Sequence, residues 1–334
     1  MSIPQHTRLD RHLALAAFLV AFVVVVLGAY VRLSDAGLGC PDWPGCYGRM
    51  VLPADGGERA AAAAAYPERP LEAGKAWKEM IHRYAAGGLG LLILGLAVRA
   101  WLRPGLRAGL PTALLGLVIF QALLGMWTVT LLLKPLVVVA HLAGGFSVLA
   151  LLWWYWLRLG GGEALRGGSA PGWAMPAAGA GLALLVLQIL LGGWTSSNYA
   201  ALACTGFPAC VGQYWPDMDF ARGFTLWHGL GIDYEGGVLD HPARVAIHMT
   251  HRMGAGVVAL VVGGLGIGLL LAARGAPRVL GAALLAALSL QIGLGVTNVL
   301  MYLPLPVAVA HNGAAALLLL TLLSVLYGLR RAAS

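Results

Sequence analysis

Long apolar stretches, separated by short polar, glycine-rich or proline-rich segments, recur along the whole chain. A helix needs about 20 apolar residues to cross a bilayer, and each stretch reaches that length. The pattern predicts eight membrane-spanning helices, over residues 13–31, 80–100, 110–131, 136–157, 174–195, 244–271, 279–301 and 305–329. Pro304 and Pro306 divide the last two, because proline ends one helix and can open another. The first stretch is too long for a signal peptide and no small-x-small cleavage site follows it, so we expect it to be retained.

Composition supports this class of protein. Of the 334 residues, 59% are hydrophobic and 11% are charged, whereas roughly a quarter of the residues in a soluble domain are charged. We therefore expect an all-α membrane protein. The formal net charge is +8, but lysine and arginine are scattered at the ends of the apolar stretches and form no basic stripe with interleaved aromatic residues. This distribution argues against a nucleic-acid partner and for charges that set the orientation in the lipid bilayer.

The cations are distributed unevenly between the two ends of the predicted helices. They concentrate at both termini and in the connections after the second, fourth and sixth helices, whereas the connections after the third and seventh hold only Lys134. By the positive-inside rule we expect cytoplasmic termini in a bacterial-type inner (plasma) membrane, with the long connections 32–78 and 196–243 on the outer face. Residues 60–65 are all alanine. This run suits a short helix across the outer mouth of the helix bundle and a flexible spacer equally well.

The second half of the chain repeats landmarks of the first half in the same order. Gly28, Leu38, Cys40, Pro44, Cys46 and Gly48 recur at one constant offset as Gly192, Leu202, Cys204, Pro208, Cys210 and Gly212. His82 recurs as His251, and Gln121, Gly125, Ala140 and His141 recur as Gln291, Gly295, Ala310 and His311. These matches predict an internal duplication into two four-helix bundles, residues 1–166 and 167–334, each with a cysteine loop and a site in its core.

All four cysteines fall in the two long connections, in two pairs with five residues between the members. An even number of cysteines in an oxidising compartment favours local disulfides, Cys40–Cys46 and Cys204–Cys210. A redox-active dithiol is the alternative, although the spacing is wider than in Cys-x-x-Cys. Zinc is disfavoured, because only the second connection contains histidine.

One histidine occurs near the outer end of the second and fourth helix of each half: His82, His141, His251 and His311. A single histidine in a membrane helix is more often a hydrogen-bonding partner than a ligand, but four at duplicated places favour ligation. All four are expected within the first two turns or so, which gives each pair the similar depth that axial ligation of one porphyrin requires. Neighbouring glycines would make room for a flat ring: Gly87, Gly88, Gly144, Gly145, Gly254, Gly256 and Gly313. Two heme pockets are the favoured interpretation, and separate metal centres with one histidine each are the weaker alternative.

Arg83 and Arg252 directly follow two of these histidines. Each guanidinium could pair with a heme propionate, and snorkelling to the membrane interface explains both residues equally well. A second motif, Gln-x-x-Leu-Gly, begins at Gln121, Gln188 and Gln291 in the third, fifth and seventh helices. Packing of helices through small residues explains its glycines better than contact with a cofactor does.

Glu79 stands three residues before His82, on the same helical face. An acid in a membrane helix is costly without a use, and a carboxylate beside an apolar porphyrin edge can take up a proton released on oxidation. The second half has His248 at the matching place, so only the first half carries the acid. We therefore expect chemistry in the first half and an electron relay in the second, with His251 as the ligand because it keeps the His-Arg-x3-Gly spacing of His82.

Taken together, these motifs resemble the heme A synthase family over all eight predicted helices. The resemblance is carried by Gly37-Leu-Gly-Cys40-Pro-Asp-Trp-Pro-x-Cys46, Glu79-x-x-His82-Arg83, Ala-His141, His251-Arg252 and Ala-His311-Asn312. It implies an oxidoreductase that converts the ring methyl of heme O to the formyl of heme A by successive hydroxylation, for heme-A-containing terminal oxidases. It also implies that His251 and His311 bind a resident heme B, and that His82 and His141 hold the substrate heme with Glu79 beside the methyl.

The partners implied by the resemblance are heme O, supplied by a heme O synthase, and an electron acceptor; a homo-oligomer is compatible with the sequence. Two other function classes also use four histidines. A diheme quinol-linked electron carrier would need no acid in one half only, and a heme transporter would bind heme without chemistry. Heme A would be formed only by the synthase.

Overall fold

The computed structural model describes residues 5–103 and 105–332. Within them, eight helices are long and apolar enough to cross a membrane, as the hydrophobic pattern predicts. They are α1 (Gln5–Leu33), α3 (Ala73–Leu102), α4 (Gly109–Thr130), α5 (Pro135–Trp156), α6 (Ala174–Ser197), α8 (His241–Ala272), α9 (Ala276–Leu300) and α10 (Leu305–Ala332). Helices α3 and α8 begin before their apolar stretches do, and α8 is started by the Asp240 cap and by a proline in its first turn.

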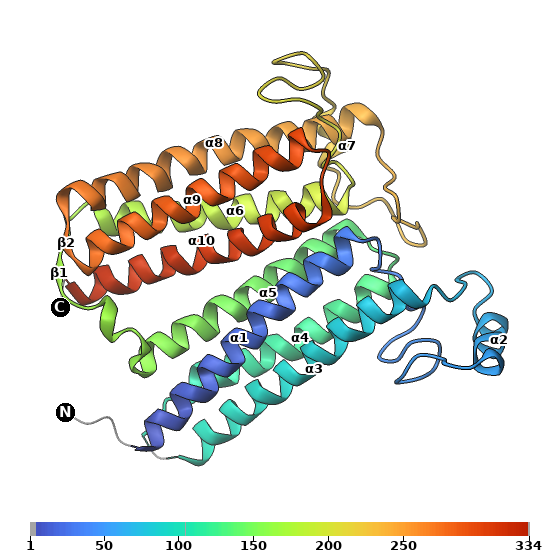
Figure 1. Cartoon of the computed structure of the whole chain (residues 1–334), viewed down its shortest axis with the longest axis horizontal. Helices are drawn as coiled ribbons and strands as arrows, with labels where there is room; N and C mark the ends of the chain where they lie inside the picture. Colours follow the sequence, from blue (N-terminus) through green and yellow to red (C-terminus); the bar gives the residue numbers. More distant parts are fainter. Residues whose placement is uncertain (1–4, 104, 333–334) are drawn as a thin grey trace.

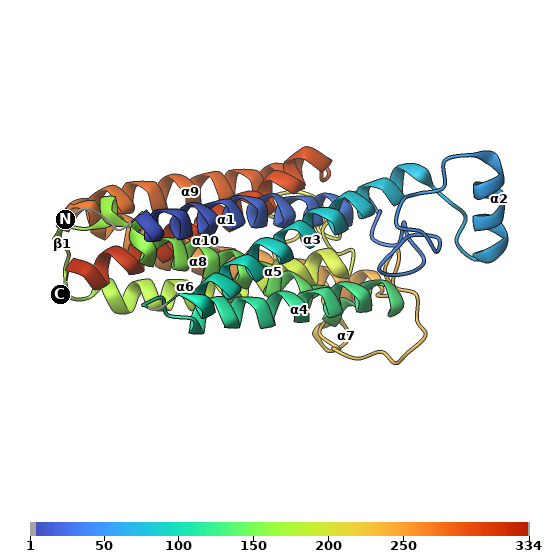
Figure 2. The ribbon, with the colours of Figure 1, turned by 90° about the horizontal axis from the view of Figure 1, so that it is seen from below.

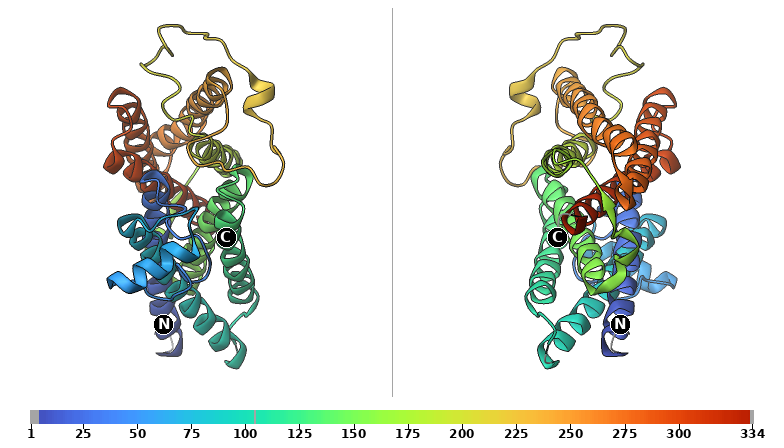
Figure 3. Two further views of the ribbon diagram at one scale, coloured as in Figure 1. Left: turned by 90° about the vertical axis from the view of Figure 1, so that its right-hand side faces the viewer. Right: turned by 90° about the vertical axis from the view of Figure 1, so that its left-hand side faces the viewer.

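The long helices form two groups that lie side by side (Figure 1). In the first group α1 contacts α3 and α5, and α4 contacts the same two helices, so that α1 is diagonal to α4 and α3 is diagonal to α5. The second group repeats this arrangement, with α8 diagonal to α10. The groups meet where α1 and α5 pack against α10 and α6 (Figure 3). Each group is therefore a four-helix bundle in which a diagonal pair faces a shared centre.

Two long loops project from one end of the bundles, and α1 starts and α10 finishes at the opposite end (Figures 1 and 2). We call residues 34–72 the first cysteine loop and residues 198–240 the second cysteine loop. The alanine run lies in a helix, α2 (Gly56–Ala65), whose N-terminus is capped by the Asp55 carboxylate accepting from the Glu58 N–H. Of the two alternatives for this run, the helix is the one the structure contains. A single turn, α7 (Phe220–Gly223), lies in the second cysteine loop.

The opposite end holds the connection between the halves. A π-turn (Leu157–Gly161) and a 3₁₀ turn (Glu163–Leu165) lead to β1 (Gly168–Ser169), which pairs antiparallel with β2 (Arg274–Gly275). A Cβ atom at Gly168 would lie 2.0 Å from the Arg274 carbonyl oxygen, so only glycine allows the two strands to approach this closely. The two-stranded ladder thereby ties the first turn after the amino-terminal bundle to the α8–α9 hairpin.

The second cysteine loop folds back over the first bundle. The Arg69 guanidinium of the first loop donates to Asp233 and Glu235 of the second, at 2.6 Å each. Lys134, at the start of α5, donates to the Gly229 carbonyl at 2.7 Å, and its ammonium group lies over the Trp227 ring. These contacts brace the two loops against each other at the end of the bundles where the four histidines are found.

Candidate functional site: four imidazoles in two bundle cores

The four histidines lie on the diagonal helices of the two bundles. His82 is on α3 and His141 on α5, and the two imidazoles are close enough to interact electrostatically. His251 on α8 and His311 on α10 interact in the same way. Because α3 and α8 begin early, His82 and His251 lie in about the third turn of their helices, one turn deeper than expected from the sequence. The pairing predicted from matched depth is the one that the fold brings together.

Each imidazole rests on a glycine of the adjacent helix. A Cβ atom on that glycine would lie 3.1 to 3.4 Å from the Cε1 atom of the histidine. The pairs are Gly28 with His82, Gly125 with His141, Gly192 with His251 and Gly295 with His311. Contacts this short leave little room for a side chain. The three glycines of the Gln-x-x-Leu-Gly motif therefore contact three of the imidazoles, and Gly28 contacts the fourth. This is a more specific role for the motif than the general helix packing expected from the sequence.

Glutamine amides from the same motif reach two of the imidazoles. The Nε2 atom of Gln188 lies 3.0 Å from Nδ1 of His251 and donates to the His251 carbonyl at 2.9 Å. The Nε2 atom of Gln291 lies 3.2 Å from Nε2 of His311. Glutamine and glycine are four residues apart on one helical face, so one helix supplies both contacts. The sequence contained this signal, but only the fold shows that each motif faces a histidine.

Two glycines that were expected to make room for a porphyrin make room for glutamine instead. A Cβ atom at Gly144 would lie 1.7 Å from Nε2 of Gln121, and one at Gly254 would lie 2.3 Å from Oε1 of Gln188. Gly87, Gly88 and Gly256 have open space in the corresponding direction. Gly145 and Gly313 face the side chains of Val25 and Val26, at 4.0 and 3.6 Å from the position of a Cβ atom. The glycines near the histidines thus divide into those that accept an amide, those that face valine and those with nothing within 4 Å.

The donor set fits axial ligation of a heme iron. Nδ1 of His82, His141 and His311 is buried without a hydrogen-bond partner among the described residues. Orphaned buried imidazole nitrogens are costly unless they have a further partner, and a metal is one. No cluster of three or more histidine, cysteine, aspartate or glutamate side chains occurs within residues 5–103 and 105–332. The paired imidazoles therefore suit a metal whose other ligands come from a porphyrin.

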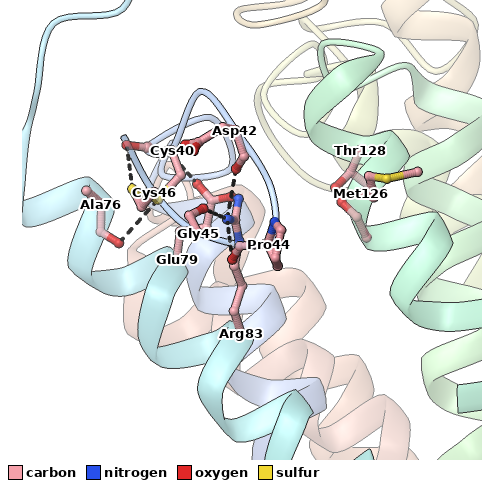
Figure 4. A network of polar contacts seen from close by, with 12 residues as sticks. Cys40, Asp42, Pro44, Gly45, Cys46, Ala76, Glu79, Arg83, Met126 and Thr128 are labelled. Carbon is pink, nitrogen blue, oxygen red and sulfur yellow. Dashed lines mark hydrogen bonds and ion pairs between the residues drawn. A yellow bond between two sulfur atoms is a disulfide. The ribbon is translucent and has the colours of Figure 1, made fainter. Parts of the chain in front are cut away.

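The first cysteine loop is fastened to α3 by Arg83 and Glu79 (Figure 4). The Arg83 guanidinium donates to the carbonyl oxygens of Asp42 (2.9 Å), Pro44 (3.2 Å) and Gly45, and it pairs with the Glu79 carboxylate. The side chain of Glu79 is buried, and its Oε2 atom accepts from the Cys40 N–H at 2.9 Å. The contacts of Arg83 are with loop carbonyls and with Glu79, and they join the first cysteine loop to α3.

The second cysteine loop is fastened to α8 in a related way. Arg252 donates to the carbonyl oxygens of Cys204 (3.0 Å), Gly206 (2.9 Å) and Ala209 (3.3 Å). His248, 5% exposed, has its Nδ1 atom 2.9 Å from the Ala200 carbonyl oxygen. Glu79 accepts from its loop, whereas His248 is placed to donate to its loop. His248 is thereby engaged with the loop backbone, and His251 is the histidine that pairs with His311.

Both expected disulfides are present, Cys40–Cys46 and Cys204–Cys210, and the described residues include no free cysteine. Each closes a short turn in which the second cysteine exchanges backbone hydrogen bonds with a residue three positions later, Arg49 or Gln213. The turns carry the carbonyl groups that Arg83 and Arg252 bind.

A model of the cytochrome oxidase assembly protein family matches residues 11–323. A protein of Shewanella oneidensis described as a heme A synthase is 46% identical over 305 residues, which cover 91% of this chain and 92% of that protein. The chain belongs to the heme A synthase family. Heme A synthases of Paracoccus denitrificans and Rhizorhabdus wittichii are similar at 30% and 28% identity, over 91% and 98% of this chain and over 84% and 95% of theirs. The similarity to this family therefore extends through both bundles.

Proposed function

We propose that the protein is a heme A synthase that oxidises the ring methyl of heme O to the formyl of heme A by successive hydroxylation. The observation that carries the proposal is the pair of facing imidazoles in each bundle, with a buried acid beside only one pair. Family membership and the name of the 46% identical relative support the same activity. Each hydroxylation adds one oxygen atom to the methyl carbon and, with water as its source, releases two electrons and two protons. The reaction therefore needs an electron acceptor besides the protein.

In this proposal the two bundles have different tasks. His82 and His141 hold the substrate heme in residues 1–166, and His251 and His311 hold a resident heme B in residues 167–334. Heme B bound there would supply one-electron redox chemistry and could serve as a relay to the acceptor. The matching histidine, glycine and arginine contacts of the two halves support an internal duplication, and the contacts of α1 and α5 with α10 and α6 join the two cores.

Glu79 is the proposed proton acceptor of the first half. It is 5% exposed and lies one turn before His82, and the matching position in the second half is occupied by His248. A carboxylate takes up protons that oxidation of a methyl group releases. Its contacts with Arg83 and Cys40 fix its position, so the same side chain can hold the loop in place and accept a proton.

We further propose that the termini are cytoplasmic and that the cysteine loops face the outside of a bacterial-type inner membrane. The end of the bundles opposite the cysteine loops carries a series of arginines: Arg99, Arg103, Arg158, Arg166, Arg274 and Arg278. By the positive-inside rule this end faces the cytoplasm. Disulfides in both loops agree with an oxidising compartment on the other side.

Extraction of hemes from membranes tests the proposal directly. The chain is expressed with a heme O synthase, hemes are extracted with acidified acetone, and the extract is separated by chromatography. Heme A in the extract, and its absence when an H82A H141A double variant replaces the wild type, is the expected result. Heme B alone would favour the diheme electron carrier, and unchanged heme O would favour the transporter.

A further inference from the structure

Each of the four imidazoles packs against a glycine of the adjacent helix, which we call its seat glycine. Three of these four sites share a feature that the fourth lacks. Gln121, Gln188 and Gln291 each precede the seat glycine by four residues, on the same helical face. At the seat of His82, the residue four positions before Gly28 is Val24, which packs in the apolar core. The helix α1 therefore offers the His82 imidazole a glycine but no amide.

We propose that His82 is the exchangeable ligand of the substrate heme and that Val24 makes it so by replacing a glutamine. The inference rests on the proposed function and goes beyond it, because it assigns different roles to His82 and His141. In this scheme His141 anchors the heme, and His82 is released when substrate enters or product leaves.

The physical reason lies in the second ring nitrogen. An imidazole that binds a metal through one nitrogen carries a proton on the other, and a hydrogen-bond acceptor for that proton orients the ring and raises its basicity as a ligand. The Oε1 atoms of Gln188 and Gln291 are buried without a hydrogen-bond partner among the described residues. Since amide oxygen and nitrogen exchange places on a half-turn of the side chain, each glutamine can present this acceptor to its histidine.

His141 has a glutamine beside it as well. The Gln121 amide lies against Gly144, one turn from His141 on α5, just as the Gln188 amide lies against Gly254, one turn from His251 on α8. Nδ1 is buried without a hydrogen-bond partner among the described residues in both His82 and His141. The two differ in the neighbouring helix, which carries the Gln121 amide at His141 and only the apolar side chain of Val24 at His82. Three ligands can thus be supported by an amide, and one depends on its metal bond alone.

This asymmetry matches what the two sites must do. A resident relay has to keep its cofactor, and both of its histidines contact glutamine. A substrate site has to admit heme O and release heme A, and a ligand without support dissociates more readily. Removing a hydrogen-bonding partner behind a metal ligand typically costs about 10- to 100-fold in metal affinity.

The test measures heme release. Purified protein loaded with heme O is mixed with excess apomyoglobin, which captures released heme, and the hemes left in the protein are followed by chromatography. Heme O and heme B are chemically distinct, so the two sites are measured separately. V24Q is compared with V24L, which adds a similar bulk without an acceptor, and with Q188L and Q291L in the second bundle.

We expect V24Q to slow heme O release about 10- to 100-fold, with V24L close to wild type and heme B release unchanged in both. Q188L and Q291L should speed heme B release by a similar factor and leave heme O release unchanged. Equal release of heme O from V24Q and wild type, or equal slowing by V24L, overturns the inference. If V24Q does not accumulate, V24N is judged by the same criteria. Failure of the wild type to bind heme O at all would refute the proposed function instead.

Discussion

The Cys40 backbone N–H donates to the Glu79 carboxylate across 2.9 Å, which links the first disulfide turn to the helix that carries His82. The other carboxylate oxygen pairs with Arg83, whose guanidinium also binds carbonyl groups of the same turn. The geometry of the disulfide turn and the position of the acid are thus set by one hydrogen-bonded network. A change in the disulfide turn is expected to shift the Glu79 carboxylate, and a change at Glu79 is expected to shift the turn.

Replacing Glu79 with glutamine separates its proton chemistry from its structural contacts. Glutamine can still accept from Cys40 through its carbonyl oxygen, so heme should still bind. Because an amide cannot accept a proton, heme A formation should fall by roughly 10² to 10⁴, and partly oxidised alcohol should accumulate in the extracted hemes. H248Q, at the matching place of the second half, is the control and should keep its activity. Normal heme A formation in E79Q, or loss of all heme, would make Glu79 a structural residue.

Replacing His311 with alanine should abolish the low-spin bis-imidazole spectrum of heme B, because the iron then loses one axial ligand. The absorption and paramagnetic resonance spectra of the purified variant provide the measurement. H248A is the control, since Nδ1 of His248 contacts the Ala200 carbonyl oxygen of the second cysteine loop. A heme B spectrum that survives H311A unchanged would contradict the pairing of His251 with His311.

Enlarging a seat glycine should displace one imidazole and leave the other bundle intact. A Cβ atom at Gly28 would lie 3.1 Å from His82, and one at Gly192 would lie 3.2 Å from His251. We expect G28V to lose substrate heme and keep heme B, and G192V to show the reverse, as measured by the heme content of purified protein. G264V is the matched control, because nothing lies within 4 Å of a Cβ atom there. Loss of both hemes from either seat variant would indicate general misfolding.

The Arg83→Lys substitution should loosen the first disulfide turn. Lysine keeps the charge but cannot reproduce the fork of donors that reaches three carbonyl groups and Glu79. Hydrogen bonds to charged groups contribute about 1.5–3 kcal/mol each, so losing one should make Cys40–Cys46 about 10- to 150-fold more accessible to a reductant. Thiol labelling followed by peptide mass mapping measures this, and Cys204–Cys210 in the same sample is the internal control. Equal labelling of both pairs would argue against a specific role of Arg83.

The sequence by itself determined the spans, their order and the local disulfide pairs. Apolar length is enough to place eight helices, because the bilayer imposes a fixed thickness and leaves the backbone no alternative to internal hydrogen bonds. The spacing of Cys40 and Cys46 was enough to pair them locally. The recurrence of histidine on alternate helices was enough to predict two pairs of ligands. These are properties of single segments or of repeats, which a linear pattern records directly.

Only the tertiary structure decided what each side chain touches. The sequence placed Glu79 on the face of His82, but the fold turns its carboxylate to Cys40 and Arg83, because a helix that extends back to Ala73 brings the first cysteine loop down beside it. Gln188 and Gln291 were part of a visible motif, yet their contacts with His251 and His311 depend on which helices become neighbours. Helix adjacency follows from packing among surfaces that are apolar on all sides, and such surfaces leave no periodic signal in the sequence to say which face meets which.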